Sequence, residues 1–322
     1  MRQTRTLPRP TRYTSILRLI CLLLLPVSAA APAANSRAID SPDAVVVTIK
    51  PLYSLLAQLT DGVTTPVLLM TEAQSPHHYS MRPSERRLLA NASMIVWIGP
   101  QLESSMSKII QQQKQSTVVT AMQADNLRLL NKRQKHTHDD DQPATGNTAL
   151  DRRDPHIWLS AHNAIAISRQ LSDRLIELDP QNSERYRQNL QQLLSRIEQT
   201  AAFVTATLKD SDQPFITFHD AFQYFEDENH LHYANSVNFD EEAGASLKHV
   251  RRIKASMEEH HIQCLVYQQP KPAIIDALTR QSTATATALD PLGLNAKNDK
   301  DAWFEIMRSL AVGFRQCLHP AQ

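Results

Sequence analysis

Residues 179–208 read DPQNSERYRQNLQQLLSRIEQTAAFVTATL, and this stretch decides how the rest of the chain can be arranged. It predicts a helix, with Asp179 suited to the N-cap and Pro180 to the first helical position. Apolar residues then recur at intervals of three and four, namely Tyr186, Leu190, Leu193, Leu194, Ile197, Ala201, Val204 and Leu208. A helix over 180–208 would be roughly 43 Å long, which is enough to join two lobes.

Short apolar runs typical of strands lie on both sides of this helix, separated by helical patterns. They cover 45–49, 67–70, 94–98 and 118–122 before it, and 215–218, 264–267 and 284–289 after it. Such alternation favours parallel sheets covered by helices. We therefore predict an α/β fold with two lobes, each a parallel β-sheet flanked by helices, joined by one long rigid linker helix. A single α/β domain with a long crossover helix is the alternative.

The first residues are typical of an export signal. Residues 1–18 carry five arginines and no acid, 19–27 are an apolar run, and 28–34 are small. The apolar run has about half of the ~20 residues that a spanning helix needs. We expect a signal peptide over 1–34, cleaved between 30 and 34, and an exported protein. The remaining domains are then an N-terminal lobe over 35–179, the linker helix over 180–209 and a C-terminal lobe over 210–322.

Composition argues against several classes of function. Only 6 of 322 residues are glycine, and neither GxGxxG nor GxxxxGK[ST] occurs, which disfavours nucleotide-dependent chemistry. Without the leader's five arginines, the 34 basic residues fall to 29 against 33 acidic ones, a net charge of about −4. This balance excludes a strongly basic nucleic-acid binder.

Two cysteines remain after the leader, Cys264 and Cys317. In an oxidising compartment such a pair is expected to form a disulfide, and two buried free thiols are the alternative. Residues 131–149 have no apolar pattern and carry His136, His138 and three consecutive aspartates. We expect a mobile loop there, which either binds metal weakly or is simply a solvated insertion.

Several histidines follow predicted strands. His77 and His78 come after the strand at 67–70, and His219 directly follows 215–218. Asp290 follows the strand at 284–289, and we place His156 at a strand end as well. Open α/β sheets carry their sites at the carboxyl ends of strands, and imidazole with a carboxylate suits Zn²⁺. The sequence therefore predicts one metal site between the lobes.

Four motifs surround these residues: 75–84 read SPHHYSMRPS, 154–160 DPHIWLS, 218–225 FHDAFQYF and 289–293 LDPLG. In this order they resemble the metal motifs of zinc-specific periplasmic binding proteins of ABC transporters, the ZnuA type of the cluster A-I metal receptors. The resemblance spans residues 45–318. It also covers the two cysteines, which lie where those proteins have a disulfide, and the 131–149 segment, which lies where they carry a His/Asp-rich loop.

The resemblance implies three imidazoles and a carboxylate at or near the metal: His77, His156, His219 and Asp290. Manganese relatives place a glutamate at the position of His219, and manganese prefers oxygen ligands. Two departures concern the first motif, where Pro76 replaces a glutamate that can coordinate and His78 replaces an aspartate. These leave the fourth ligand open among Asp290, His78 and water.

The function implied is a periplasmic receptor that binds Zn²⁺ and delivers it to an inner-membrane ABC permease and its ATPase. Such a receptor is expected to be a monomer that catalyses nothing, with a small lobe tilt on closure because its linker helix is stiff. Two alternatives stay open. One is a receptor for Mn²⁺, Fe²⁺ or Cu²⁺ with the same fold. The other is a secreted zinc hydrolase, which would need a general base beside a metal-bound water. No HExxH-type element occurs, and Glu226 or Glu228 is not an obvious candidate for that base.

Overall fold

The computed structural model describes residues 44–71, 74–133, 152–238, 247–280 and 282–319. These fall within one compact unit, Arg37–Gln322. The predicted signal peptide and residues 134–149, with His136 and His138, lie outside the described residues. None of the helices within those ranges is both long enough and apolar enough to cross a membrane.

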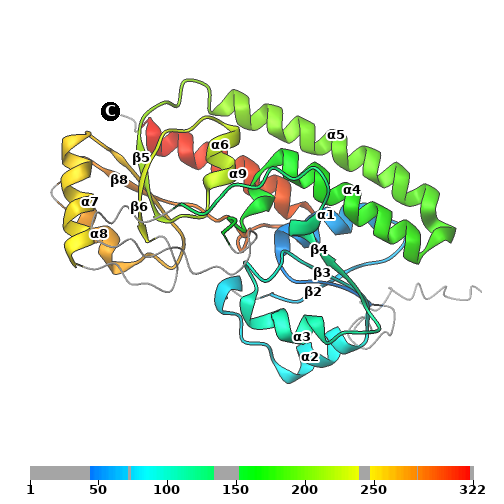
Figure 1. The fold of residues 1–322 in the computed structure, drawn as a ribbon. Coiled ribbons are helices and arrows are strands. Elements are labelled where there is room, and N and C mark those ends of the chain that lie inside the picture. Colours follow the sequence, from blue (N-terminus) through cyan, green and yellow to red (C-terminus); the bar gives the residue numbers. More distant parts are fainter. Residues whose placement is uncertain (1–43, 72–73, 134–151, 239–246, 281, 320–322) are drawn as a thin grey trace, which may run out of the picture. The chain divides into compact units, whose positions relative to one another are not determined.

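The first sheet has four parallel strands in the order β2-β1-β3-β4 (Figure 1). The strands are β1 (Ala44–Val47), β2 (Val67–Leu68), β3 (Ala92–Trp97) and β4 (Thr117–Thr120). The helices α1 (Lys50–Leu59), α2 (Pro83–Ala90) and α3 (Ser107–Gln111) follow strands of this sheet. Apolar runs such as AVVV in β1 are buried along their whole length, as expected for a parallel strand covered on both faces.

The second sheet is also parallel, in the order β6-β5-β7-β8. It consists of β5 (Phe215–His219), β6 (Tyr233–Asn238), β7 (Cys264–Tyr267) and β8 (Thr285–Ala288), with α6 (Gln223–Glu228), α7 (Leu247–Glu259) and α8 (Ala273–Thr279) between them. The predicted two-sheet fold is thereby confirmed. Strand β6 was not predicted, because its sequence YANSVN has no apolar run; its Ser236 pairs instead with the Thr217 hydroxyl at 2.8 Å.

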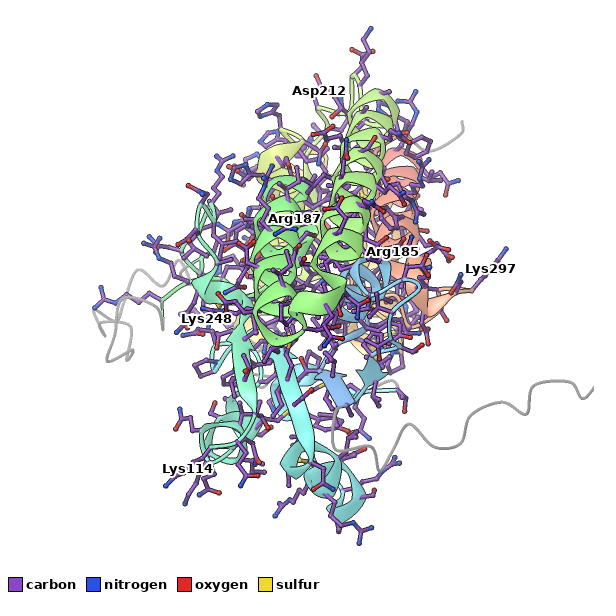
Figure 2. All side chains as sticks on the ribbon, turned by 90° about the vertical axis from the view of Figure 1, so that its right-hand side faces the viewer. Lys114, Arg185, Arg187, Asp212, Lys248 and Lys297 are labelled. Atoms are coloured by element: carbon purple, nitrogen blue, oxygen red, sulfur yellow. A yellow bond between two sulfur atoms is a disulfide. The ribbon has the colours of Figure 1, made fainter. Side chains whose placement is uncertain are left out.

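The predicted long helix is α5 (Ser183–Thr207), and a 3-10 turn (η5, Pro180–Asn182) precedes it. Asp179 lies at the N-cap position of this turn, and its carboxylate accepts bonds from the Asn182 amide and the Tyr186 hydroxyl. Tyr186 is buried, whereas its neighbours Arg185 and Arg187 are exposed at the surface of the protein (Figure 2).

A second long helix, α4 (Ala161–Leu178), runs beside α5 (Figure 1). It was not predicted, although its signals are present in the sequence. The Ser160 hydroxyl accepts a bond from the Asn163 N–H at 3.1 Å, which is an N-cap, and the buried positions Ala164, Ile167, Leu171 and Leu175 follow at helical spacing.

The apolar core is shared between the two sheets. One cluster of buried residues contains members of both, including Val46 of β1 and Phe215 of β5. Helix α9 (Ala302–Leu318) joins them, because the indole of its Trp303 donates to the Trp158 carbonyl at 2.8 Å and its backbone N–H bonds Ser54 of α1. A separate, smaller cluster fills the space between the second sheet and helices α7 and α8. The two sheets are thus held together by continuous packing.

The predicted disulfide is present. Cys264 of β7 is bonded to Cys317 of α9, with a Cα–Cα distance of 5.1 Å. The alternative of two free thiols is therefore wrong. The bridge fastens the last helix to the second sheet.

Candidate metal centre

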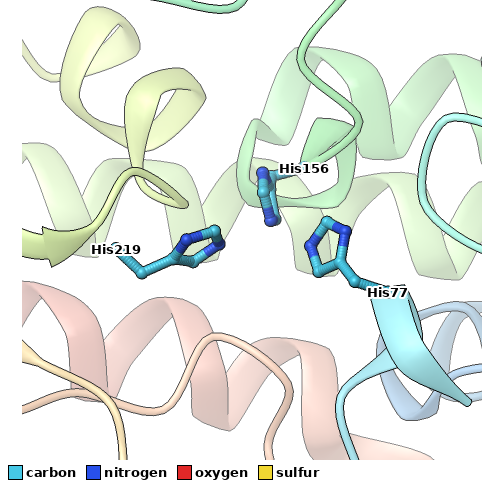
Figure 3. A group of neighbouring side chains, drawn as sticks. All are labelled: His77, His156 and His219. Carbon is cyan, nitrogen blue, oxygen red and sulfur yellow. The ribbon is translucent and has the colours of Figure 1, made fainter. Parts of the chain in front are cut away.

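Three histidines from distant parts of the chain meet at one point (Figure 3). The ring centroids of His77, His156 and His219 lie 5.3 to 5.7 Å apart. Each offers one ring nitrogen, and these three nitrogens all lie within 4.8 Å of one another. Among the described residues, this is the group of metal-ligating side chains that could hold an ion.

His77 lies in a short 3-10 turn, η1 (Pro76–His78), between β2 and α2. The local sequence favours this turn, because Pro76 fits its first position and the Ser75 hydroxyl accepts a bond from the His77 N–H at 3.3 Å. Ser105 supports the turn from outside, since its hydroxyl donates to the Tyr79 carbonyl at 2.8 Å. His77 is half-buried, so its ring lines the site from the more open side.

His156 does not follow a strand, so its expected place at a strand end is wrong. It directly precedes a 3-10 turn, η4 (Ile157–Leu159), which leads into α4. The Asp154 carboxylate holds it, with Oδ1 2.7 Å from the ring Nδ1 and 2.9 Å from the backbone nitrogen of His156. A neutral His156 therefore donates from Nδ1 to Asp154 and leaves the Nε2 lone pair for a metal ion.

His219 is the last residue of β5, as its place after the apolar run 215–218 predicts. Pairing with Asn238 of β6 fixes its backbone, and the ring is buried. Burial, together with the neighbouring rings of His156 and His77, lowers the pKa of His219 well below the ordinary value.

The environment also favours a neutral His77. Burial, and then His156, Lys132 and His78, lower its pKa to about 3. A neutral imidazole has a free lone pair, which is the form that binds a metal ion. The rings of His77 and His219 are thus uncharged at neutral pH and can bind a cation.

The two other candidate ligands lie outside the group of three histidines. Asp290 follows β8 as predicted, and its carboxylate accepts bonds from the backbone N–H groups of Leu292 and Asn295 and from the Asn295 amide. His78 is exposed, with its ring centroid 6.5 Å from that of His77. The neighbouring Pro291 carbonyl accepts a bond from the Trp158 indole, which ties the Asp290 segment to the segment after His156.

The donor set suits a small, borderline-soft cation. Three imidazole nitrogens from three separate elements leave a fourth position for a carboxylate or water, which is the tetrahedral arrangement that Zn²⁺ adopts. Asp154 was not predicted to be part of this centre. A carboxylate two residues before a candidate ligand histidine is the signal that could have found it.

Comparisons with known proteins identify the family of this chain. Residues 45–317 match the model of the ZnuA family, described as the periplasmic component A of the zinc-uptake complex. The high-affinity zinc uptake system protein ZnuA of Yersinia pestis is 29% identical over 291 residues, which cover 85% of this chain and 91% of that protein.

Solved structures share the fold. A crystal structure of ZnuA aligns with a TM-score of 0.72 at 20% identity, covering 87% of this chain and 100% of that one. The Mn²⁺ complex of FpvC from Pseudomonas aeruginosa aligns equally well, with a TM-score of 0.72 at 18% identity over 86% of this chain and 99% of that one. The fold is therefore shared by ZnuA and by a protein solved in complex with Mn²⁺, so the fold alone does not identify the ion.

Proposed function

The chain belongs to the ZnuA family of periplasmic zinc-uptake components, and from this we propose that it is the receptor that binds Zn²⁺ and delivers it to an inner-membrane ABC permease and its ATPase. The observation that carries the proposal is the convergence of His77, His156 and His219, whose ligand nitrogens lie within 4.8 Å of one another. In this proposal the three rings bind the transported ion directly.

The ligand types support zinc over manganese. Mn²⁺ prefers several oxygen ligands, whereas three neutral imidazoles suit zinc, and the general affinity order of divalent metals also favours zinc. We keep Asp290 as the candidate fourth ligand, with His78 and water as the other options. Movement of the Asp290 carboxylate toward the ion would require it to exchange its bonds to Leu292 and Asn295.

The contacts of the nearby acids support a receptor rather than a hydrolase. A zinc hydrolase needs a carboxylate or another base beside the metal-bound water. Glu226 is bonded to Arg133 at 2.6 Å, and the Glu228 carboxylate accepts bonds from the first backbone N–H groups of α4. Both side chains are engaged in holding the fold, which leaves reversible binding as the chemistry of the site.

The remaining features belong to the same proposal. Export by a signal peptide over residues 1–34 would bring the receptor to the periplasm, where the disulfide between Cys264 and Cys317 is stable. Residues 35–179 and 210–322 would form the two lobes, with 180–209 between them. We expect a monomer, because the receptor presents its ion to a permease and needs no second copy for its site.

The test begins with metal analysis of protein purified without added metal, followed by competition titrations with Zn²⁺ and Mn²⁺. We expect bound zinc and a clear preference for Zn²⁺ over Mn²⁺. The variant His219→Ala should lose tight zinc binding, whereas His260→Ala, at an exposed position outside the group of three histidines, should keep it. Equal zinc affinity of the wild type and His219→Ala would contradict the proposed site.

A further inference from the structure

The segment that carries His156 is paired with residues 130–132, which directly precede Arg133. The Lys132 N–H donates to the Arg152 carbonyl at 2.8 Å, and the Asp154 N–H donates to the Leu130 carbonyl at 3.0 Å. These bonds form a short antiparallel ladder. Asp154 also holds the His156 ring, so a displacement of the ladder would move this candidate ligand.

Arg133 reaches from this ladder to the elements around His219. One guanidinium nitrogen lies 2.6 Å from Asp220, the residue after His219, and another lies 2.6 Å from Glu226 of α6. The guanidinium plane also lies over the Tyr233 ring of β6, 3.5 Å from its centroid. Both carboxylates are buried, at 9% and 1% exposed, so this is an interior ion cluster and not a surface pair.

Two further contacts of α6 reinforce the same junction. The Tyr224 hydroxyl donates to the Asp154 carbonyl at 2.9 Å and accepts a bond from the Leu130 N–H at 3.1 Å, so it touches both strands of the ladder. The Glu228 carboxylate accepts from the N–H groups of Ala161 and His162 at the start of α4. Helix α6, which follows His219, is thus bonded to the chain on both sides of His156.

We propose that Arg133 is a positioning residue of the metal site. By bonding both Asp220 and Glu226, its guanidinium fixes His156 and His219 relative to each other. This inference rests on the proposed function, because it assumes that both histidines bind the ion. It goes beyond that function in assigning a role to a residue that touches no ion. The third ligand, His77, is supported separately by Ser75 and Ser105.

The geometry explains why the residue is an arginine. A guanidinium presents its donors in a planar fork that can meet two carboxylates while its face covers an aromatic ring. Lysine carries the same charge but cannot reproduce the fork. The substitution Arg133→Lys therefore separates geometry from charge, whereas Arg133→Gln would also leave two buried carboxylates without a cation and could prevent folding.

Arg196 offers a matched control on α5. It pairs with Asp301 at 2.9 Å, and its guanidinium lies 4.0 Å from the centroid of the Phe304 ring. The same chemistry, a carboxylate with an aromatic ring, is thus present at an arginine that, among the described residues, bonds neither the ladder nor α6. Arg196→Lys makes the same substitution at a more exposed ion pair, and it should leave the zinc site unaffected.

The experiment compares the wild type, Arg133→Lys and Arg196→Lys by zinc competition against a chromophoric chelator, by the absorption spectrum of the Co²⁺-loaded protein and by thermal unfolding of the metal-free protein. We expect Arg133→Lys to lower zinc affinity at least 10-fold, in the range usual for residues that orient ligands, and to change the Co²⁺ spectrum. Arg196→Lys should keep the zinc affinity and the spectrum, whatever its melting temperature.

Two outcomes would overturn the inference. Unchanged zinc affinity and an unchanged Co²⁺ spectrum in Arg133→Lys would show that the cluster only stabilises the fold. An equal loss of affinity in both variants would show a general effect of destabilisation. A wild type that binds no zinc tightly would instead refute the proposed function, so that the two failures can be told apart.

Discussion

His219 occupies the position at which ion preference should be decided. It lies at the buried end of β5, and its ring centroid is 5.3 Å from that of His156 and 5.7 Å from that of His77. A glutamate at this position would add a negative charge and up to two oxygen donors. We predict that His219→Glu lowers zinc affinity more than manganese affinity, because zinc favours nitrogen ligands more strongly than manganese does.

Competition titrations of the wild type, His219→Ala and His219→Glu measure this effect. Mutating a residue that only orients a metal ligand typically lowers metal affinity about 10–100-fold. The alanine variant loses a ligand itself, so its zinc affinity should fall by at least as much, and its manganese affinity should not rise. A glutamate variant with the wild-type ratio of zinc to manganese affinity would show that this position does not select the ion.

Glu103 is a fully buried carboxyl group at the carboxyl ends of the two central strands of the first sheet. It accepts bonds from the Thr48 hydroxyl at 2.5 Å and from the N–H groups of Ile98 and Gly99, and so ties the ends of β1 and β3 together. Burial raises the pKa of Glu103 from 4.5 to about 7, despite these bonds. The folded state therefore holds this proton over a pH range in which the unfolded chain has lost it.

From this shift we predict a pH dependence of stability. Because the pKa is higher in the folded state, the protonated carboxyl stabilises the fold, and this contribution is complete below about pH 4.5. It is lost as the pH rises to about 7, which lowers the free energy of unfolding by on the order of 3 kcal/mol. Urea unfolding of the metal-free wild type and Glu103→Gln at pH 5 and pH 8 measures it, with Glu198→Gln, at an exposed position of α5, as control. The same pH dependence in wild type and Glu103→Gln would refute the prediction.

At the scale of elements, the disulfide between β7 and α9 closes a long loop. Its cysteines are 53 positions apart, and in the chain-entropy model a loop of this length stabilises the fold by ~4 kcal/mol. We predict that the double variant Cys264→Ala, Cys317→Ala unfolds at a markedly lower urea concentration. The wild type should show no reactive thiol when unfolded without reductant after signal cleavage. Two reactive thiols in that assay would contradict the bridge.

The segment before His156 leads to a second prediction at this scale. Residues 131–133 belong to the ladder and to the Arg133 cluster, so the predicted mobile loop over 131–149 is wrong for these three residues. Deleting 134–149 should leave tight zinc affinity nearly unchanged, because the three histidines and the ladder remain. Deleting 131–149 should lower it at least 10-fold, because Arg133 is lost.

Zinc titration of both deletion variants, with circular dichroism to verify folding, measures the difference. A large loss of tight-site affinity in the shorter deletion would mean that His136 or His138 takes part in the main site. Equal affinity in the two deletion variants would mean that Arg133 does not position the ligands.

At the scale of the whole molecule, the shared core limits how far the lobes can move. Trp303 bonds both Trp158 and Ser54, and the Lys300 carbonyl accepts bonds from Ser54 and Gln58 of α1. A wide hinge opening would expose this packing to water. We therefore predict a small tilt on zinc binding and not a large hinge closure.

Spin labels at Lys114, near the first sheet, and at Lys248, on α7, can measure this tilt, since both side chains lie at the surface (Figure 2). The distance distribution between the labels should shift only slightly and stay narrow when zinc is added. A shift as large as a whole-domain closure would show that the shared core opens, and the rigid linker would then be refuted.

The amino-acid sequence by itself predicted the two-sheet architecture, the long helix and the disulfide, and its motifs, through their resemblance to zinc receptors, pointed to the three histidines that lie together in the fold. These follow from local patterns, because apolar runs, helical spacing, cysteine number and the short metal motifs are properties of neighbouring residues. Even so, β6 escaped detection because its side chains are polar, and α4 was overlooked although its cap and its buried face are encoded locally.

Only the tertiary structure decided how the site is supported. Arg133 and Asp220 are 87 positions apart, and Tyr224 and Leu130 are 94 apart, so no local pattern predicts that they are bonded. Ligand types are a matter of residue identity, whereas the geometry that holds them arises from packing between segments that meet only in the folded chain.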